Sequence, residues 1–153
     1  MITIFWNPSG PVLVTALPPG STWSAQYFID HVLRKLQETN AYRDAQRRNK
    51  KFTIHMDNAR VHTAAIVTDY MAANGFARAP HPPYSPDLAP SDFYLFGALK
   101  ERIRGQQFAN SEQIIDWILD EFERIPSEQL EAAFLNWQER LDKCANGTGG
   151  YIQ

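Results

Sequence analysis

Cysteine is scarce in this sequence: Cys144 is the only one among 153 residues, which excludes an internal disulfide framework and fits a reducing compartment. No apolar run approaches the ~18 residues that cross a membrane, and the N-terminus lacks the basic and apolar pattern of a signal peptide. Charge of one sign is not in excess either, because the net charge is −2, so a nucleic-acid partner could be recognised only from local patches. We therefore expect a soluble, intracellular protein without a membrane partner.

What is present is the composition of one globular domain, with 44% hydrophobic and 21% charged residues. The β-rich runs 1–6 and 11–17 flank "NPSG", a turn sequence, which predicts an antiparallel hairpin. The elements expected after it are a helix capped at Ser21 or Thr22 that fades into 41–51, a strand over 51–58, a helix over 62–75, a short strand over 76–83, and helices over 91–105, 111–125 (capped at Ser111) and 126–144. This order predicts an α/β fold in which helices pack on a mixed sheet.

Two aspartates stand where side chains commonly meet a ligand. Asp57 comes at the C-terminal end of the strand over 51–58, the edge at which open α/β sheets bind ligands. Asp92 follows Ser91, a natural N-cap, and therefore lies in the first turn of a helix that begins after the proline-rich run 80–90. Paired carboxylates suit Mg²⁺, which takes one or two of them and keeps positions open for substrate oxygens. Such a site is typical of metal-assisted phosphoryl transfer.

Each acid also has a purely structural interpretation. Asp57 belongs to the dipeptide "DN", which favours a turn. Asp92 can stabilise its helix through the helix dipole, an effect worth ~0.3–1 kcal/mol. The two acids together, with prolines fixing the approach to Asp92, favour a site over two unrelated turns.

These residues belong to long motifs that resemble a known family. "HMDNARVHTA" (55–64) and "PHPPYSPDLAPSDFYLFGALKERIRG" (80–105) are similar to the catalytic domain of mariner-type transposases and their bacterial insertion-sequence relatives, the DDE recombinases. The resemblance extends to "TIFWNPSGPVLVTALPPG" (3–20), which is similar to that family's second and third strands. It also includes "FLNWQERLDKCANGTGGYI" (134–152), which is similar to its C-terminal tail from tryptophan to tyrosine.

The resemblance also identifies which aspartate of the proline-rich segment matters. Thirty-four residues lie between Asp57 and Asp92, and the resemblance implies that these are the second and third catalytic aspartates. Asp87 follows Asp57 at a spacing of only twenty-nine intervening residues and is expected to brace the loop "SPDL".

The resemblance implies a ribonuclease H-like fold, a divalent cofactor (Mg²⁺ or Mn²⁺), and cleavage and joining of DNA. Its implied partners are transposon ends and target DNA, together with a second copy of the chain or a full-length transposase. The implied location is the cytoplasm, in association with the nucleoid if the source is bacterial.

One part of the family pattern is missing. No residue here matches the first catalytic aspartate, because Asp30, the only aspartate before Asp44, falls inside a predicted helix. We therefore expect residues 1–153 to be a partial catalytic domain that lacks the first, central strand and the N-terminal DNA-binding module. Two functions remain open: a truncated strand-transfer domain that is inactive alone, or a non-catalytic remnant that binds DNA or full-length transposase.

Basic side chains offer candidate DNA contacts. Arg60 and His62 follow Asp57 and could contact a phosphate or the attacking group; alternatively, Arg60 is solvated and His62 caps the next helix. A cluster within "RDAQRRNKK" could follow a DNA backbone, which requires only positive charge within reach, or could be a solvated linker. Its candidate residues are Arg47, Arg48, Lys50 and Lys51.

Overall fold

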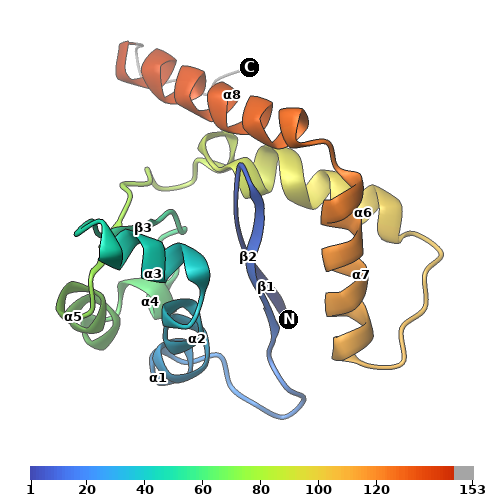
Figure 1. The fold of residues 1–153 in the computed structure, drawn as a ribbon, viewed down its shortest axis with the longest axis horizontal. Coiled ribbons are helices and arrows are strands. Elements are labelled where there is room, and N and C mark those ends of the chain that lie inside the picture. The colour runs from blue at the N-terminus through green and yellow to red at the C-terminus, as the bar shows by residue number, and fades with distance from the viewer. Residues whose placement is uncertain (147–153) are drawn as a thin grey trace. The chain divides into compact units, whose positions relative to one another are not determined.

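A computed structural model describes residues 1–146 of the chain (Figure 1). The chain divides into two compact units, the first formed by residues 1–5 and 12–83 and the second by residues 6–11 and the chain from residue 84 onward. The elements follow the predicted order, with two additional short helices (Asn40–Arg47 and Arg60–Thr63), so the predicted α/β class is confirmed. No helix among the described residues is long and apolar enough to cross a membrane. The end of the tail that resembles the transposase family, residues 147–153, lies outside the described part.

The N-terminal hairpin forms as predicted. Strand β1 (Ile2–Asn7) pairs with β2 (Gly10–Ala16), and the carboxamide of Asn7 accepts a hydrogen bond of 2.8 Å from the backbone N–H of Ser9 in the turn. Gly10 follows with φ of +123°, a conformation that side chains disfavour, so the glycine of "NPSG" is required by the turn. Phe5, Val12 and Leu13 pack against the core of the first unit.

A continuous helix follows the hairpin and supplies half of the buried residues of that core. It consists of α1 (Ala25–Phe28), a π-helical turn (Ile29–Leu33) and α2 (Arg34–Gln37). Its buried face contains Phe28, Ile29, Val32, Leu33 and Leu36. The predicted cap was wrong: Ser24, rather than Ser21 or Thr22, accepts from the N–H of Tyr27 at 3.1 Å.

The basic segment that was expected to be irregular contains a helix, α3 (Asn40–Arg47). Its N-cap is Thr39, whose hydroxyl accepts from the N–H of Tyr42 at 3.3 Å. No residue of α3 is buried. The hydroxyl of Tyr42 in this helix donates a hydrogen bond to the backbone carbonyl of Asn74. The residues of α3 do follow a helical period, but the segment is dominated by charged and polar side chains.

A parallel strand pair supports the first candidate acid. Strand β3 (Phe52–Ile54) pairs with β4 (Phe76–Arg78) in a register that places Ile54 opposite Arg78. The crossover between them contains α4 (Arg60–Thr63) and α5 (Ala65–Ala73), and Gly75 ends it at φ of +75°. The predicted strand was longer than β3, although Ile54 and Met56 are both buried, as its alternation requires. The hairpin does not pair with β3: residues 1–146 contain two separate two-stranded sheets.

The second unit is mainly helical. Its elements are a 3₁₀ turn (Pro86–Leu88), a π-helical turn (Ser91–Leu95) that continues into α6 (Phe96–Ile103), α7 (Ser111–Arg124) and α8 (Ser127–Asn146). Leu95, Leu99, Ile118 and Phe122 are among its buried residues. The cap predicted at Ser111 belongs to Asn110, which accepts from the N–H of Gln113 at 3.0 Å.

Candidate active site

Asp57 lies three residues beyond the end of β3, with its side chain 67% exposed. Its Oδ1 atom accepts a hydrogen bond of 3.0 Å from the backbone N–H of Ala59 and lies 2.8 Å from Nδ1 of His62. Both interactions use the same oxygen, so Oδ2 makes neither of them. The carboxylate is thus oriented by its own loop while it remains accessible.

The electrostatics around Asp57 favour its ionised form. Partial burial alone would raise its pKa, but the N–H of Ala59 and the neighbouring rings of His62 and His81 together hold the pKa below its usual value. Asp57 is therefore an anion at neutral pH, which is the state that a hard cation binds.

The ring of His62 is fixed between the Asp57 loop and the core. Its centroid lies 5.0 Å from that of Phe28 and 6.4 Å from that of Trp23, and the side chain is only 17% exposed. The alternative in which His62 caps the next helix is excluded, because the residue lies inside α4, and neither α4 nor α5 has a side-chain cap. His62 instead holds Asp57. Arg60, the first residue of α4, is exposed.

A second arginine, which the sequence did not single out, closes the same loop. Arg78 lies at the end of β4, and its Nη1 donates to the carbonyl oxygen of His62 at 2.8 Å. Its Nη2 donates to the carbonyl oxygen of Asp57 and to Oδ1 of Asn58, the latter at 3.2 Å. The parallel register places Arg78 opposite Ile54, three residues before Asp57, and so brings its side chain to the loop.

Two further histidines lie beside this loop. Nε2 of His55 is 3.0 Å from Nδ1 of His81, and the carbonyl oxygen of His81 accepts from Nδ2 of Asn58 at 2.9 Å. Burial, the neighbouring His81 and the positive charge of Arg78 lower the pKa of His55 to about 4, although Asp57 acts in the opposite direction. His55 is therefore neutral at pH 7, and one ring of the pair donates to the other.

Asp92 lies in the second unit, exposed in the π-helical turn Ser91–Leu95. The helix begins one residue earlier than predicted: Pro90 is its first helical residue, and the N–H of Asp92 donates to the carbonyl of Ala89 at 2.9 Å. Ser91 does not cap the helix; its hydroxyl accepts from Nε1 of Trp6 at 2.9 Å.

The residues around Asp92 are held by contacts within the second unit. Arg140 of α8 lies over the ring of Phe93, with its Cζ 4.3 Å from the ring centroid, and donates to the carbonyl oxygen of Asp87 at 3.0 Å. Asp87 itself lies in the 3₁₀ turn, which agrees with its expected place in a loop. Asp57 and Asp92 belong to different units, and their convergence on one metal ion stays a prediction.

The two acids fit a divalent cation in their chemistry, since each is an exposed carboxylate next to a structured element. Residues 1–146 contain no group of three or more histidine, cysteine, aspartate or glutamate side chains gathered for a metal. The basic residues Arg47, Arg48, Lys50 and Lys51 are all exposed at the end of α3 and the turn after it, where Arg47 pairs with Asp44 at 3.2 Å.

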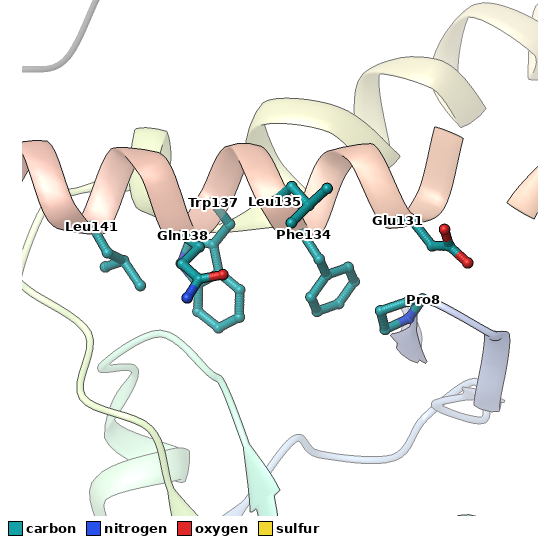
Figure 2. A pocket seen from close by; sticks show the side chains of 7 residues that line it. All are labelled: Pro8, Glu131, Phe134, Leu135, Trp137, Gln138 and Leu141. Carbon is teal, nitrogen blue, oxygen red and sulfur yellow. The ribbon is translucent and has the colours of Figure 1, made fainter. Parts of the chain in front are cut away.

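An apolar hollow of about 480 Å³ lies in the second unit along α8, and it contains neither candidate acid. Figure 2 shows the side chains of Phe134, Trp137 and Leu141 directed to one side of α8, with Pro8 of the hairpin turn at its edge. Because its lining offers so few polar atoms, this hollow does not suit phosphodiester chemistry.

Comparison with known proteins shows which family the chain matches. Residues 20–115 match the model of the DDE superfamily endonuclease family, a range that includes both aspartates. The mariner Mos1 transposase of Drosophila mauritiana is 29% identical over all of this chain, and the human histone-lysine N-methyltransferase SETMAR is 32% identical over 99% of it. The chain spans 45% and 22% of these curated relatives, less than half of either.

Solved structures give the same result for the fold. The crystal structure of the Mos1 catalytic domain matches 99% of this chain and 75% of its own, with a TM-score of 0.85 and 28% identity. The ribonuclease H-like fold expected from the resemblance is thereby confirmed. Other matching structures show the Mos1 catalytic domain with Raltegravir and Mn or Mg, and the Mos1 strand transfer complex.

Proposed function

Because this chain belongs to the DDE superfamily endonucleases and resembles their transposase catalytic domains, we propose that it binds Mg²⁺ or Mn²⁺ through Asp57 and Asp92 and contributes these acids to DNA strand cleavage and transfer. The observation that carries the proposal is the state of Asp57: an accessible, ionised carboxylate, fixed through one oxygen, at the end of β3. Asp92 is the second acid because it is exposed at a helix start and has the family's spacing from Asp57.

The chemistry supplied by bound divalent ions is activation of the attacking oxygen and neutralisation of charge on the phosphate and the leaving oxygen. The chain's own contribution is placement. His62 and the N–H of Ala59 hold Oδ1 of Asp57, which leaves Oδ2 available as a ligand. The contacts of Ser91 and Phe93 fix the backbone on both sides of Asp92.

DNA is the proposed substrate and partner, as transposon ends and as target. The exposed group Arg47, Arg48, Lys50 and Lys51 supplies positive charge that can follow a phosphate backbone, and exposed Arg60 supplies more beside Asp57. His62 is already bonded to Asp57, so we assign it to orienting that acid ahead of contacting DNA. A second copy of the chain or a longer transposase is the proposed protein partner.

Mn²⁺ binding tests the metal site directly, by electron paramagnetic resonance or calorimetry on the 153-residue chain. We expect Asp57→Asn and Asp92→Asn each to lower the affinity about tenfold or more. If both acids hold one ion, the double variant should lose much less than the sum of the two free-energy changes. Asp69→Asn and Asp120→Asn, at exposed positions of the first and second unit, are matched controls. Strictly additive losses would mean two separate sites and would refute the shared metal.

Activity is the second test. The resemblance implies a third catalytic acid that no residue of this chain matches, so we expect no strand cleavage by these 153 residues with Mg²⁺ or Mn²⁺. The measurement is nicking of supercoiled DNA by the purified chain. Clear nicking that disappears in Asp92→Ala would show that two acids are sufficient.

A non-catalytic role is the alternative, and the observation that favours it is that no residue of the sequence matches the family's first catalytic aspartate. In that role the chain binds DNA or full-length transposase and modulates it. The nucleotide sequence upstream of Met1 separates the two proposals. An in-frame strand with an acidic residue, preceded by a helix-turn-helix segment, supports the enzyme, whereas a stop codon or frameshift supports the remnant.

A further inference from the structure

We propose that Arg78 is a positioning residue for Asp57: from the neighbouring parallel strand, it holds both ends of the segment 57–62 and thereby fixes the direction of the Asp57 carboxylate. This inference rests on the proposed function, because it assigns a supporting residue to the metal-binding acid named there.

The contacts of Arg78 span the whole segment. One terminal nitrogen donates to the carbonyl of His62, and the other donates to the carbonyl of Asp57 and the side chain of Asn58. The carbonyl oxygens of Asp57 and His62 are five residues apart in sequence, yet a single guanidinium bonds to both. The segment is therefore closed across its base.

This closure determines the position of the carboxylate. Oδ1 of Asp57 is held by the N–H of Ala59 and by Nδ1 of His62, and both groups lie within the segment that Arg78 closes. If the two ends move apart, the distance from Asp57 to His62 increases and Oδ1 loses its orienting partner. The strand pair also fixes the position of Arg78 itself. The N–H of Ala79 donates to the carbonyl of Ile54 at 2.9 Å, and this bond holds Arg78 beside the end of β3.

The chemistry of this position requires arginine. The guanidinium is a flat fork whose nitrogens reach separate acceptors in fixed directions, whereas the ammonium of lysine is a single point with a larger hydration shell. A lysine at position 78 would keep the positive charge but could not serve the three acceptors in the same geometry. Arg78→Lys is thus expected to resemble Arg78→Gln, and this distinguishes a geometric role from a simple effect of charge.

The experiment measures loop closure without metal, and then metal affinity. In the metal-free chain, we expect faster amide hydrogen exchange at Ala59 and His62 in Arg78→Gln and Arg78→Lys. The amides of Phe52 and Ala79, which bond to Gly75 and Ile54 across the strand pair, should keep their exchange rates and report that the fold is intact. Arg34→Gln, which removes an exposed arginine of the same unit, is the matched control and should leave the exchange rates of both pairs of amides unchanged.

Mn²⁺ titration of the same variants completes the test. We expect the affinity to fall about tenfold in both Arg78 variants, as is usual when a residue supporting a metal ligand is removed, and to stay unchanged in Arg34→Gln. Unchanged exchange at Ala59 and His62, or wild-type Mn²⁺ affinity in Arg78→Gln while Asp57→Asn is impaired, would overturn this inference. Full Mn²⁺ affinity in Asp57→Asn would instead overturn the proposed function, and the exchange rates would still decide whether Arg78 closes the loop.

Discussion

The indole Nε1 of Trp6 donates a 2.9 Å hydrogen bond to the hydroxyl of Ser91, a residue 85 positions further along the chain and directly before Asp92. Trp6 also packs edge-on against Phe134, with ring centroids 5.0 Å apart. A residue of the N-terminal hairpin thus anchors the start of the helix that carries the second candidate acid.

Breaking this bond should destabilise the second unit. We expect Ser91→Ala to lower the free energy of unfolding by about 1 kcal/mol, because the half-buried indole N–H loses its acceptor. Trp6→Phe should cost more, since packing is lost as well. In a double-mutant cycle measured by urea unfolding, the coupling between the two positions should be about 0.5–1.5 kcal/mol. A coupling near zero would mean that the bond contributes nothing to stability.

Mild acid should destabilise the first unit through His55. Its folded pKa of about 4 is below the value of 6.5 for an unperturbed histidine, so between these pH values the unfolded chain binds the additional proton. Stability is therefore greatest above pH 6.5 and decreases as the pH falls toward 4. For a half-buried ring, we expect the contribution to be about 1 kcal/mol.

Urea unfolding at pH 7 and pH 4.5 measures this contribution. His55→Gln should show a smaller loss of stability between the two pH values than the unchanged chain. His31→Gln, at an exposed position, is the control and should follow the unchanged chain. An equal loss in the chain with and without His55 would contradict the prediction.

The glycines provide a test with opposite signs. Gly75 has φ of +75°, and an added Cβ would lie 2.6 Å from Nε2 of Gln46, so Gly75→Ala should destabilise by about 1 kcal/mol or more. Gly97 lies within α6 with nothing near its missing Cβ, and Gly97→Ala should stabilise by about 0.5–1 kcal/mol. Gly105→Ala, at φ of +77° in open space, isolates the conformational cost at Gly75. Thermal unfolding of the three variants gives the comparison.

The sequence predicted those parts of the fold in which periodicity and turn residues agree. The hairpin around "NPSG" and the helix containing Phe28, Val32 and Leu36 are examples, because burial of one face determines both elements. Prediction from the sequence failed where several neighbouring polar residues are each suitable as the N-cap of a helix. Ser24 caps the first helix although Ser21 and Thr22 are equally suitable in sequence, and the choice depends on where the helix face meets the core.

The candidate site was only partly accessible to sequence reasoning. Motif resemblance and spacing selected Asp57 and Asp92 as candidates, but the bond between His62 and Asp57 depends on the conformation of the loop. Arg78 could not be found at all, since its approach to residues 57–62 follows from the register of two strands separated by a crossover. Helix α3 was missed because charged and polar residues dominate its segment and none of its residues is buried, although the segment has a helical period.

The edge of β3 predicts self-association. Within residues 1–146 β3 pairs only with β4, so its other edge has no strand partner. Unpaired edges promote pairing with other chains, and we expect the purified chain to run as more than a monomer in size-exclusion chromatography. Thr53→Lys places a charge on β3 at an exposed position and should shift the chain toward the monomer. A compact monomer at all concentrations before any substitution would contradict this expectation.

The π-helical turn at Asp92 has a consequence for insertions and deletions. The N–H of Phe96 bonds to the carbonyl of Ser91, five residues earlier, so this turn contains one residue more than an α-helical turn. Deleting one residue between them would restore a regular helix, and Leu95 and Leu99 could keep their buried places. Because the π-turn fits its extra residue into a single turn, the residues on the two sides of the deletion, Asp92 included, would keep their directions around the helix axis. The same deletion within the regular part of α6 would instead rotate the residues on its two sides by about 100° relative to each other, so this turn is the place where the helix tolerates a change of length.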